Sequence, residues 1–309
     1  MEKISIIVPC YNEQESLPLF YDEIVKVTKK MAKVNFEFIF VNDGSKDSTL
    51  EISRELSKKD KRVRYISFSR NFGKEAAILA GLEASTGDFI ATLDADLQDP
   101  PILIEEMYNY IKEENYDCVA TKRVSRKGEP KIRSFFAECY YKLINKISKT
   151  EIVNGARDFR LMTRQMLDSI LELKEYNRYS KGIFSWVGYK TKWLEFENVE
   201  RVAGTTKWSF WKLFLYAIES IVAFSTVPLV LPIFIGILFI VVSVILITIL
   251  IVKLCMELYV GTLLLYFFLC LSTGAILISL GVLGLYLSKT YLEIKNRPVY
   301  IIKETEKSK

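Results

Sequence analysis

The chain of 309 residues contains no histidine. This absence excludes histidine-based catalytic triads, histidine metal sites and histidine general bases. The five cysteines form no C-x-x-C pair, which favours reduced, structural thiols over a disulfide framework. The net charge of +5 is mild and no basic-aromatic module accompanies it, so we expect no nucleic-acid partner.

Charged residues are also missing from two long stretches near the C-terminus. Residues 228–252 and 261–287 are runs of 25 and 27 residues without a charge. Because about 20 apolar residues cross a bilayer core, each run predicts a transmembrane helix; the alternative is a pair of helices buried in a soluble core. No signal peptide precedes them, since Met1 leads directly into charged residues and a strand. We therefore expect a domain over 1–207, an interfacial amphipathic helix over 208–227, a transmembrane hairpin over 228–287 and a basic tail over 288–309.

The distribution of charge predicts how the hairpin is oriented. The connector 253–260 holds one Lys and one Glu, whereas the tail is rich in Lys and Arg. Positive residues stay inside, so we expect both termini and the 1–207 domain in the cytoplasm, at a bacterial plasma membrane. The spans carry no ionisable residue, which argues against a transporter. Small residues near one face of the second span would allow close packing within the hairpin or between subunits of a homo-oligomer: Gly274, Gly281, Gly284 and Ser288.

The first part of the chain alternates between short apolar runs and helical patterns. The runs predict strands at 4–8, 36–41, 63–68, 89–93 and 118–121. This alternation is typical of a doubly wound, Rossmann-like α/β sheet. In such a sheet, the polar loops that follow the first four strands lie along one edge, where ligands bind.

Two carboxylates, Asp94 and Asp96, follow the fourth strand two positions apart. At a strand end, side chains at this spacing can converge on one point, and hard oxygen ligands suit Mg²⁺ or Mn²⁺. Gln98 would add a neutral oxygen from the next turn. A D-x-D pair also occurs by chance about once in a chain of this size. The prediction of a metal site therefore depends on the position of the pair at the same sheet edge as the other polar loops.

Several motifs occur in an order that resembles one family. Together they are similar to the inverting glycosyltransferases of family 2, with the GT-A fold, and in particular to the polyisoprenyl-phosphate glycosyltransferases, the dolichol-phosphate mannose synthase-like and GtrB-type enzymes. The motifs lie at 8–13, 41–45, 94–101, 158–162, 201–208 and 295–300. The chain departs from the family pattern at Asn42, where a second Asp is common, and at Thr206, where Ser is common.

The resemblance implies roles for individual residues. Pro9, Tyr11 and Glu13 would line the nucleotide, and Asp43 would read the base or ribose. Asp94 and Asp96, with Gln98, would hold the metal that neutralises the leaving diphosphate. Asp158 would be catalytic, either as a base or by positioning the sugar or acceptor.

A basic segment follows the fifth strand and precedes an amphipathic, aromatic stretch at 135–143. Arg123, Arg126 and Arg133 are candidates to capture a lipid phosphate beside a membrane-interface helix, and Arg201 and Lys207 are second candidates. The alternative is an ordinary solvated face.

The sequence thus predicts a membrane-anchored, metal-dependent enzyme that transfers one hexose from a nucleotide sugar to undecaprenyl phosphate. UDP-glucose is the first choice of donor, followed by UDP-N-acetylglucosamine and GDP-mannose. Two rival functions remain at this point. A processive polysaccharide synthase is disfavoured because the Gln-x-x-Arg-Trp motif is absent, and the other rival is a non-catalytic, sugar-nucleotide-binding scaffold.

Overall fold

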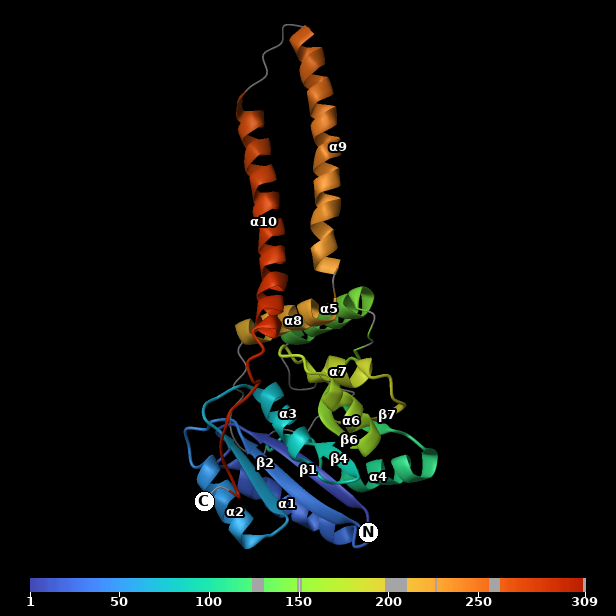
Figure 1. Cartoon of the computed structure of the whole chain (residues 1–309). Coiled ribbons are helices and arrows are strands. Elements are labelled where there is room, and N and C mark those ends of the chain that lie inside the picture. The colour runs from blue at the N-terminus through green and yellow to red at the C-terminus, as the bar shows by residue number, and fades with distance from the viewer. Residues whose placement is uncertain are drawn as a thin grey trace.

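The computed structural model describes residues 1–123, 131–148, 150, 152–197, 210–225, 227–255 and 262–307. A sheet domain lies at one end, two helices lie side by side above it, and two long helices extend away from it (Figure 1). The strands are β1 (Lys3–Cys10), β2 (Asn35–Asn42), β3 (Val63–Phe68), β4 (Phe89–Thr92), β5 (Cys118–Arg123), β6 (Ala156–Thr163), β7 (Thr191–Phe196) and β8 (Ile302–Thr305).

The helices of the sheet domain are α1 (Ser16–Lys30), α2 (Thr49–Lys59), α3 (Lys74–Ala84), α4 (Leu103–Glu114), α6 (Arg164–Glu172) and α7 (Ser180–Trp186). The remaining helices are α5 (Lys131–Ile147), α8 (Phe210–Phe224), α9 (Val227–Cys255) and α10 (Thr262–Ile294).

The sheet has the strand order β7-β5-β6-β4-β1-β2-β3-β8. Strands β4, β1, β2 and β3 are mutually parallel, while β6 is antiparallel to β4 and β8 is antiparallel to β3. The carboxyl ends of the four parallel strands therefore meet at one edge, and the amino end of β6 reaches the same edge.

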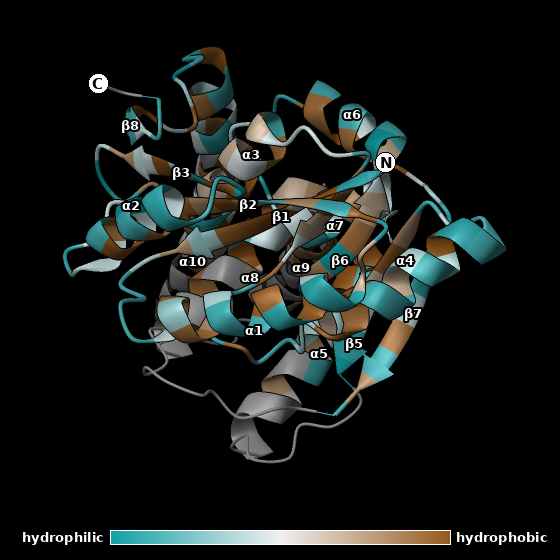
Figure 2. Cartoon of the chain, turned by 90° about the horizontal axis from the view of Figure 1, so that it is seen from below, coloured by the Kyte–Doolittle hydropathy of each residue, from teal (hydrophilic) through white to brown (hydrophobic). Residues whose placement is uncertain are grey.

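The central strands read as continuous apolar runs because helices cover both of their faces. On β1, Ile6 and Val8 pack in one core cluster with residues of α1 and α4, whereas Ile7 packs in a second cluster with residues of α3 and α6. Figure 2 shows hydrophilic residues on the outer turns of α1, α2 and α4. The predicted doubly wound α/β architecture is confirmed.

Three strands lie beyond the five that the sequence predicted. β6 and β7 complete one side of the sheet, and β8 comes from the segment expected only as a basic tail. β8 is four residues long and its neighbours are distant in sequence, so no local alternation marks it.

The two uncharged runs form helices, with 228–252 inside α9 and most of 261–287 inside α10. Among the described residues, the segment Leu271–Ile294 is long and apolar enough to cross a membrane. A second candidate arises if Ala217–Phe224 and Val227–Gly236, which meet at an angle of 81°, are counted as one bent span.

Candidate active site

The polar edge of the sheet is built where the parallel strands end. β4 leads through Leu93 into Asp94, and β2 leads into Asp43. Residue Arg160 of β6 pairs with Thr92 of β4, which places Asp158 beside the end of β4. The Thr92 hydroxyl donates to the Asp158 carbonyl and fixes this register. Residues from three separate segments therefore converge on one edge.

Lys74 joins the two carboxylates of this edge. The lysine is the first residue of α3, and its Nζ lies 2.7 Å from Asp94 Oδ1 and 2.6 Å from Asp158 Oδ2. The three side chains are between 20% and 34% exposed, so solvent and ligands can reach them. One ammonium group thus holds together two carboxylates that would otherwise repel each other.

The charges in this triad stabilise one another. Burial raises the pKa of Asp158, but Lys74 and Lys181 outweigh that effect and hold it below the ordinary value for aspartate. Burial lowers the pKa of Lys74, but the carboxylates of Asp158 and Asp94 raise it above the ordinary lysine value. The ammonium and the Asp158 carboxylate are therefore both charged at neutral pH.

The turn after Asp94 buries further oxygen atoms. Asp96 is 6% exposed and accepts from the backbone N–H of Gln98, across Leu97 with its left-handed φ of 57°. Asp99 is fully buried and is held by Arg157 through one oxygen, Oδ1, at 2.8 Å. Its other oxygen, Oδ2, has no hydrogen-bond partner within the described part of the chain. Burial raises the pKa of Asp99 more than Arg157 lowers it.

These oxygen atoms fit a divalent cation that is shared with a substrate. Within the described ranges, no group of three Asp, Glu or Cys side chains is arranged to hold a metal by itself. Mg²⁺ and Mn²⁺ commonly bind one or two carboxylates and complete their shell with waters and substrate phosphates. Asp94 and Asp96 are two carboxylates of this kind at the end of β4, and Asp99 places a further buried oxygen without a described partner in the same turn.

Asp43 ties two loops of the same edge together. Its carboxylate is 3% exposed and accepts from the backbone N–H groups of Phe72, at 2.6 Å, and Gly73, at 3.0 Å. Burial raises the pKa of Asp43 more than these two hydrogen bonds lower it. The next residue, Gly44, has a φ of +61° and no room for a Cβ, which would lie 2.3 Å from the carbonyl carbon of Arg70. This part of the edge is closely packed.

The loop after β1 interlocks with the loop after β2. The backbone N–H of Asn12 donates to Ser45, and that of Glu13 donates to the hydroxyl of Thr49. The Glu13 carboxylate accepts from Ser16. Pro9 is the penultimate residue of β1, and Tyr11 follows its end, so both lie at the polar edge. The structure thus brings these predicted nucleotide residues beside Asp43.

The predicted phosphate-binding cations lie partly outside the described residues. Arg123 is the last residue of β5, and its backbone N–H donates to Gly155 O, next to the start of β6. Arg133 belongs to α5, but its side chain is not described. Arg126, Arg201 and Lys207 lie outside the described residues.

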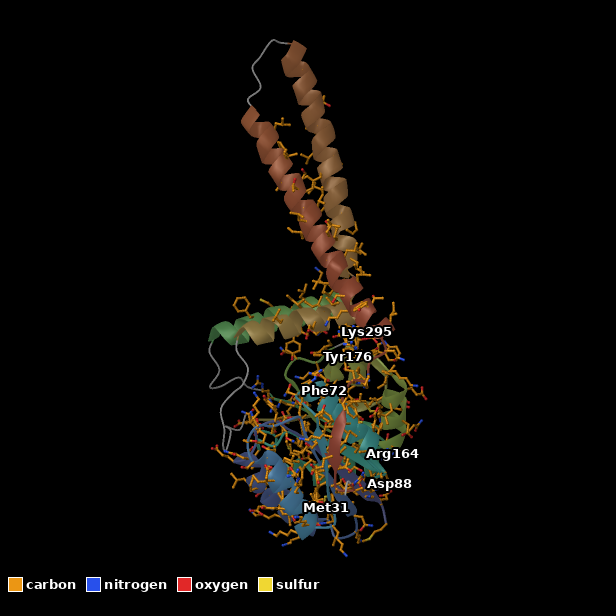
Figure 3. All side chains as sticks on the ribbon, turned by 60° about the vertical axis from the view of Figure 1, so that its left-hand side comes forward. Met31, Phe72, Asp88, Arg164, Tyr176 and Lys295 are labelled. Atoms are coloured by element: carbon orange, nitrogen blue, oxygen red, sulfur yellow. The ribbon has the colours of Figure 1, made fainter. Side chains whose placement is uncertain are left out.

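The polar edge faces helices α5 and α8, which lie side by side (Figure 1). Figure 3 labels Phe72 and Tyr176 on the side of the sheet domain that faces α5 and α8. Tyr140 of α5 lies 2.6 Å from the hydroxyl of Ser220 on α8, and Ser225 donates to the Ile147 carbonyl. The helix pair therefore forms one layer above the site, next to the bases of α9 and α10 (Figure 1).

A family model described as "Glycosyl transferase family 2" matches residues 5–171. This segment contains every carboxylate of the polar edge. The chain belongs to glycosyltransferase family 2. The resemblance noted in the sequence is thereby confirmed, and the α/β sheet is the GT-A domain of this family.

Curated relatives of this glycosyltransferase match along almost the whole chain. The putative glycosyltransferase CsbB of Bacillus subtilis (strain 168) is 44% identical, over 97% of this chain and 91% of its own length. The prophage bactoprenol glucosyl transferase homolog of Escherichia coli (strain K12) is 41% identical, over 99% and 100%. The bactoprenol glucosyl transferase of Shigella phage SfX is also 41% identical, over 97% and 99%.

The chain is distantly similar to one solved structure, that of glucosyl-3-phosphoglycerate synthase from Mycobacterium tuberculosis in complex with Mn²⁺, UDP and phosphoglyceric acid. It is 16% identical over 72% of this chain and 76% of that chain, with a TM-score of 0.46.

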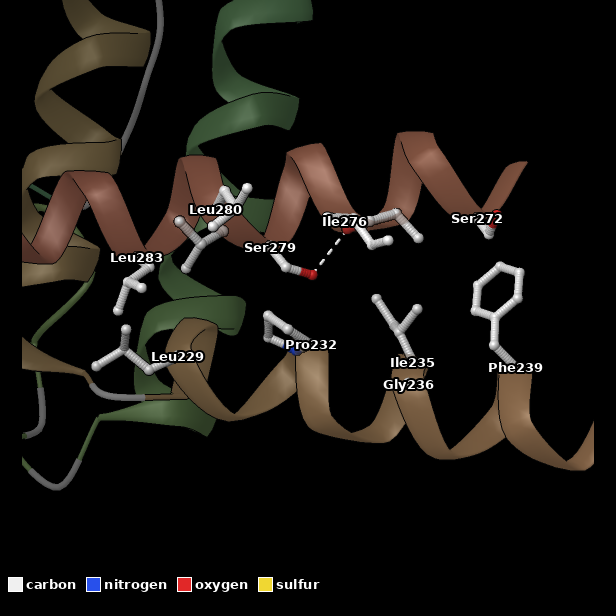
Figure 4. Close-up of a pocket in the computed structure, with 12 residues that line it drawn as sticks. Leu229, Pro232, Ile235, Gly236, Phe239, Ser272, Ile276, Ser279, Leu280 and Leu283 are labelled. Atoms are coloured by element: carbon white, nitrogen blue, oxygen red, sulfur yellow. Dashed lines mark hydrogen bonds between the residues drawn. The ribbon is translucent and has the colours of Figure 1, made fainter. Parts of the chain in front are cut away.

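The glycosyltransferase also contains a crevice far from the carboxylates. It lies between α9 and α10 with a volume of about 460 Å³. Figure 4 shows Leu229 and Pro232 of α9 facing Leu283 and Ser279 of α10, with Phe239 opposite Ser272. The Ser279 hydroxyl donates to the Ala275 carbonyl of its own helix. The lining contains no ionisable group, so the crevice is not the reaction centre.

Two parts of the site were not predicted from the sequence. Lys74 directly follows the loop after the third strand, which the sequence places at the ligand edge, but nothing local indicates its contact with Asp158. The Arg157–Asp99 pair joins residues 58 positions apart, and the packing of β6 against β4 creates it.

Proposed function

We propose that this glycosyltransferase transfers a single hexose, with inversion, from a nucleotide sugar to undecaprenyl phosphate at the cytoplasmic membrane face. The single observation that carries the proposal is the cluster of Asp94, Asp96, Asp158 and Lys74 at the sheet edge that faces α5 and α8. Donor chemistry and a membrane-proximal surface then lie next to each other. The names of the bactoprenol relatives support the lipid acceptor, and UDP-glucose is the first choice of donor.

The donor would bind across the ends of β1, β2 and β4. Pro9, Tyr11 and Glu13 would line the nucleotide, and Asp43 would read the base or ribose. Asp94, Asp96 and Gln98 would hold Mg²⁺ or Mn²⁺. When bound, this metal supplies Lewis-acid stabilisation of the negative charge on the leaving diphosphate.

In the reaction, an oxygen of the lipid phosphate attacks the anomeric carbon of the sugar. The new carbon–oxygen bond forms as the bond to the nucleoside diphosphate breaks, and the diphosphate leaves with the electron pair. A phosphate monoester has a second pKa of about 6 and is mostly dianionic at neutral pH, so it needs little help from a base. We therefore assign Asp158 to positioning the sugar or acceptor, with Lys74 holding its carboxylate.

The acceptor would approach from the membrane side. Arg123, Arg126 and Arg133 would bind its phosphate, with Arg201 and Lys207 as second candidates, because guanidinium groups form bidentate hydrogen bonds with phosphate oxygens. Helices α5 and α8 would lie in the membrane interface, and α9 and α10 would span the bilayer with both termini in the cytoplasm. The proposed divisions are 1–207, 208–227, 228–287 and 288–309.

We also propose that α10 packs against another subunit. A Cβ added at Gly274, Gly281 or Gly284 would meet no described atom within 4 Å, so the described part of the structure leaves space beside these small residues. Close contact between helices of two copies would use them.

The deciding experiment presents the full-length chain in lipid nanodiscs with undecaprenyl phosphate and labelled donors. We expect label from UDP-glucose, with Mg²⁺ or Mn²⁺, to enter a lipid-soluble product carrying one sugar. Transfer from UDP-N-acetylglucosamine or GDP-mannose instead would change the donor and keep the reaction class. Polymeric product would favour a processive synthase, and donor binding without transfer or hydrolysis would favour a scaffold.

A further test separates the acceptor from the donor. Replacing Arg123, Arg126 and Arg133 together with Gln should raise the KM for undecaprenyl phosphate by about tenfold or more, since each cation adds to the binding of one anionic headgroup. Metal-dependent hydrolysis of the donor should change little. An unaltered acceptor KM would mean that this loop is an ordinary solvated surface.

A further inference from the structure

The segment that follows α10 returns from the membrane-proximal helices to the sheet. Figure 1 shows it descending along the sheet domain to the C-terminus beside α2. β8 pairs antiparallel with the end of β3, with Phe68 opposite Ile302, and the backbone N–H of Ser69 donates to the Ile301 carbonyl at 3.0 Å. The C-terminal segment thus lies against the point where β3 enters the loop 69–73.

An aromatic stack extends this contact toward the polar edge. The Tyr300 ring stacks on Phe68, with 4.9 Å between ring centroids and an interplanar angle of 17°. Phe68 in turn meets Phe72 edge-on, at 5.8 Å and 90°. Phe72 and Gly73 donate their backbone N–H groups to the Asp43 carboxylate. A continuous series of contacts therefore runs from Tyr300 to Asp43.

The loop between these contacts has little freedom to adjust. The Arg70 guanidinium lies over the Phe72 ring, 4.1 Å from its centroid. On the other side, the Arg70 backbone approaches Gly44 so closely that no Cβ fits. Because packed side chains transmit displacement, a shift of Phe72 would move the amides that hold Asp43.

Both ends of the returning segment are fixed. At the end of α10, Glu293 accepts from the backbone N–H groups of Tyr176 and Asn177. Within β8, Glu304 receives two hydrogen bonds of 2.7 Å from Arg54. Tyr300 lies between these two attachments and also donates to Glu83. The segment is therefore anchored at its two ends, and Tyr300 lies between these anchors, on Phe68 at the start of the loop 69–73.

We propose that Tyr300 is a positioning residue for the donor: the C-terminal segment holds the Phe72 and Gly73 amides against Asp43 and thereby completes the nucleotide-binding edge. This inference rests on the proposed function, since it takes Asp43 as part of the donor site. An aromatic pair is worth about 0.5–1.5 kcal/mol beyond its buried area, which corresponds to roughly threefold to tenfold in an equilibrium constant. Losing the stack should therefore weaken donor binding by that factor and leave kcat at saturating donor nearly unchanged.

The experiment compares variants of the full-length chain in lipid nanodiscs by hydrogen exchange and by kinetics with UDP-glucose. In Tyr300→Ala, amides in the peptide covering 69–77 should exchange about threefold to tenfold faster, because their local opening becomes less costly. The KM for UDP-glucose should rise by a similar factor with kcat little changed, the pattern of lost binding rather than lost chemistry. Tyr300→Phe keeps the stack, loses the bond to Glu83 and should behave as the native enzyme.

Glu306→Gln is the matched control. It removes the ion pair with Arg64 on the same returning segment but leaves the aromatic stack in place. Its exchange at 69–77 and its donor KM should both be native. If Tyr300→Ala leaves exchange at 69–77 unchanged while β8 stays protected, the coupling is absent. If instead Tyr300→Ala loses protection in β8 and Glu306→Gln shows equal changes in exchange and in donor KM, the effect comes from attachment of the whole C-terminal segment. That result would overturn the role of the aromatic stack.

The hydrogen-exchange arm does not depend on the identity of the donor. Faster exchange with an unchanged KM for UDP-glucose, in an enzyme that uses UDP-glucose, would overturn the placement of Asp43 in the donor site. Faster exchange in an enzyme that transfers a different sugar would support the contact, and the KM for that donor would then decide the proposal.

Discussion

At the amino end of the central sheet, Glu37 is 4% exposed and receives hydrogen bonds from fixed donors on three neighbouring segments. Ser5 donates at 2.5 Å, and the backbone N–H and hydroxyl of Thr86 donate at 2.6 and 3.0 Å. Lys3 and Arg64 add ion pairs at 3.0 and 3.3 Å.

At the carboxyl end of the same sheet, Asp94 and Asp158 are bound within the described part of the chain by Lys74. A buried oxygen of Asp99 nearby accepts nothing there. Each carboxylate can accept about four hydrogen bonds. The comparison shows that one end uses a carboxylate to join strands, whereas the other end retains accepting capacity for a ligand.

The largest effect should come from neutralising the metal-binding candidates. Asp94→Asn or Asp96→Asn should lower turnover by about 10³-fold or more, because the charge on the leaving diphosphate loses its stabilisation. Circular dichroism and membrane insertion should stay native, since Asn has the size of Asp and neither residue belongs to the hydrophobic clusters. Glu37→Gln, at the other end of the sheet, is the control with native turnover. Near-normal rates of either Asp variant at saturating Mn²⁺ would remove the metal assignment.

Asp158→Asn tests whether this carboxylate positions the sugar or acceptor, or removes a proton from the acceptor phosphate. For positioning, activity should fall by about 10²-fold and the loss should be nearly constant with pH, since Asn keeps the shape and part of the hydrogen bonding. For a base, the loss should be greatest at low pH and recover between roughly pH 5.5 and 7.5, where the acceptor phosphate ionises by itself. Rates across this range, with lipid phosphate saturating, distinguish the two. A steep recovery would contradict the role we assign.

Lys74→Met should lower turnover less than the Asp variants do, and it should decrease the Mn²⁺ concentration that the enzyme requires. Without the ammonium group, Asp94 and Asp158 repel each other, and turnover should fall by about tenfold through misplacement of Asp158. The same edge becomes more negative, so the concentration of Mn²⁺ that gives half-maximal activity should decrease. A titration of activity with Mn²⁺ measures both quantities, and a higher Mn²⁺ requirement would mean that Lys74 supports rather than opposes the cation.

Glu37→Gln should change stability rather than catalysis. Burial would raise the pKa of Glu37, but hydrogen bonds from Ser5 and Thr86 and the ammonium of Lys3 hold it at about 2. Because this pKa is depressed by folding, the stabilisation is complete above the unfolded value of about 4.3 and is lost as the pH falls toward 2. The variant should lose about 1–3 kcal/mol of stability at pH 7.

Thermal unfolding from pH 7 down to 2.5 checks this prediction. The native chain should lose stability in the acid range more steeply than Glu37→Gln, and turnover at pH 7 should be alike. Equal slopes would show that Glu37 does not contribute as described.

The sequence by itself determined the alternation of strands and helices, the two uncharged helices and the family. It also placed Asp43, Asp94 and Asp96 at one edge, because side chains that follow parallel strands must share that edge. These features depend on local periodicity and on the direction of neighbouring strands, which short-range patterns specify.

Only the tertiary structure decided which distant groups meet. Lys74 and Asp158 lie 84 positions apart, and Arg54 and Glu304 lie 250 apart. In its local sequence, Lys74 looks like an ordinary surface lysine. The short segment Ile302–Thr305 looks like part of a polar tail. The strand order places β6, which carries Asp158, beside β4, and β8, which carries Glu304, beside β3. Packing of both sheet faces fixes the register of each added strand, and this register decides which distant side chains meet.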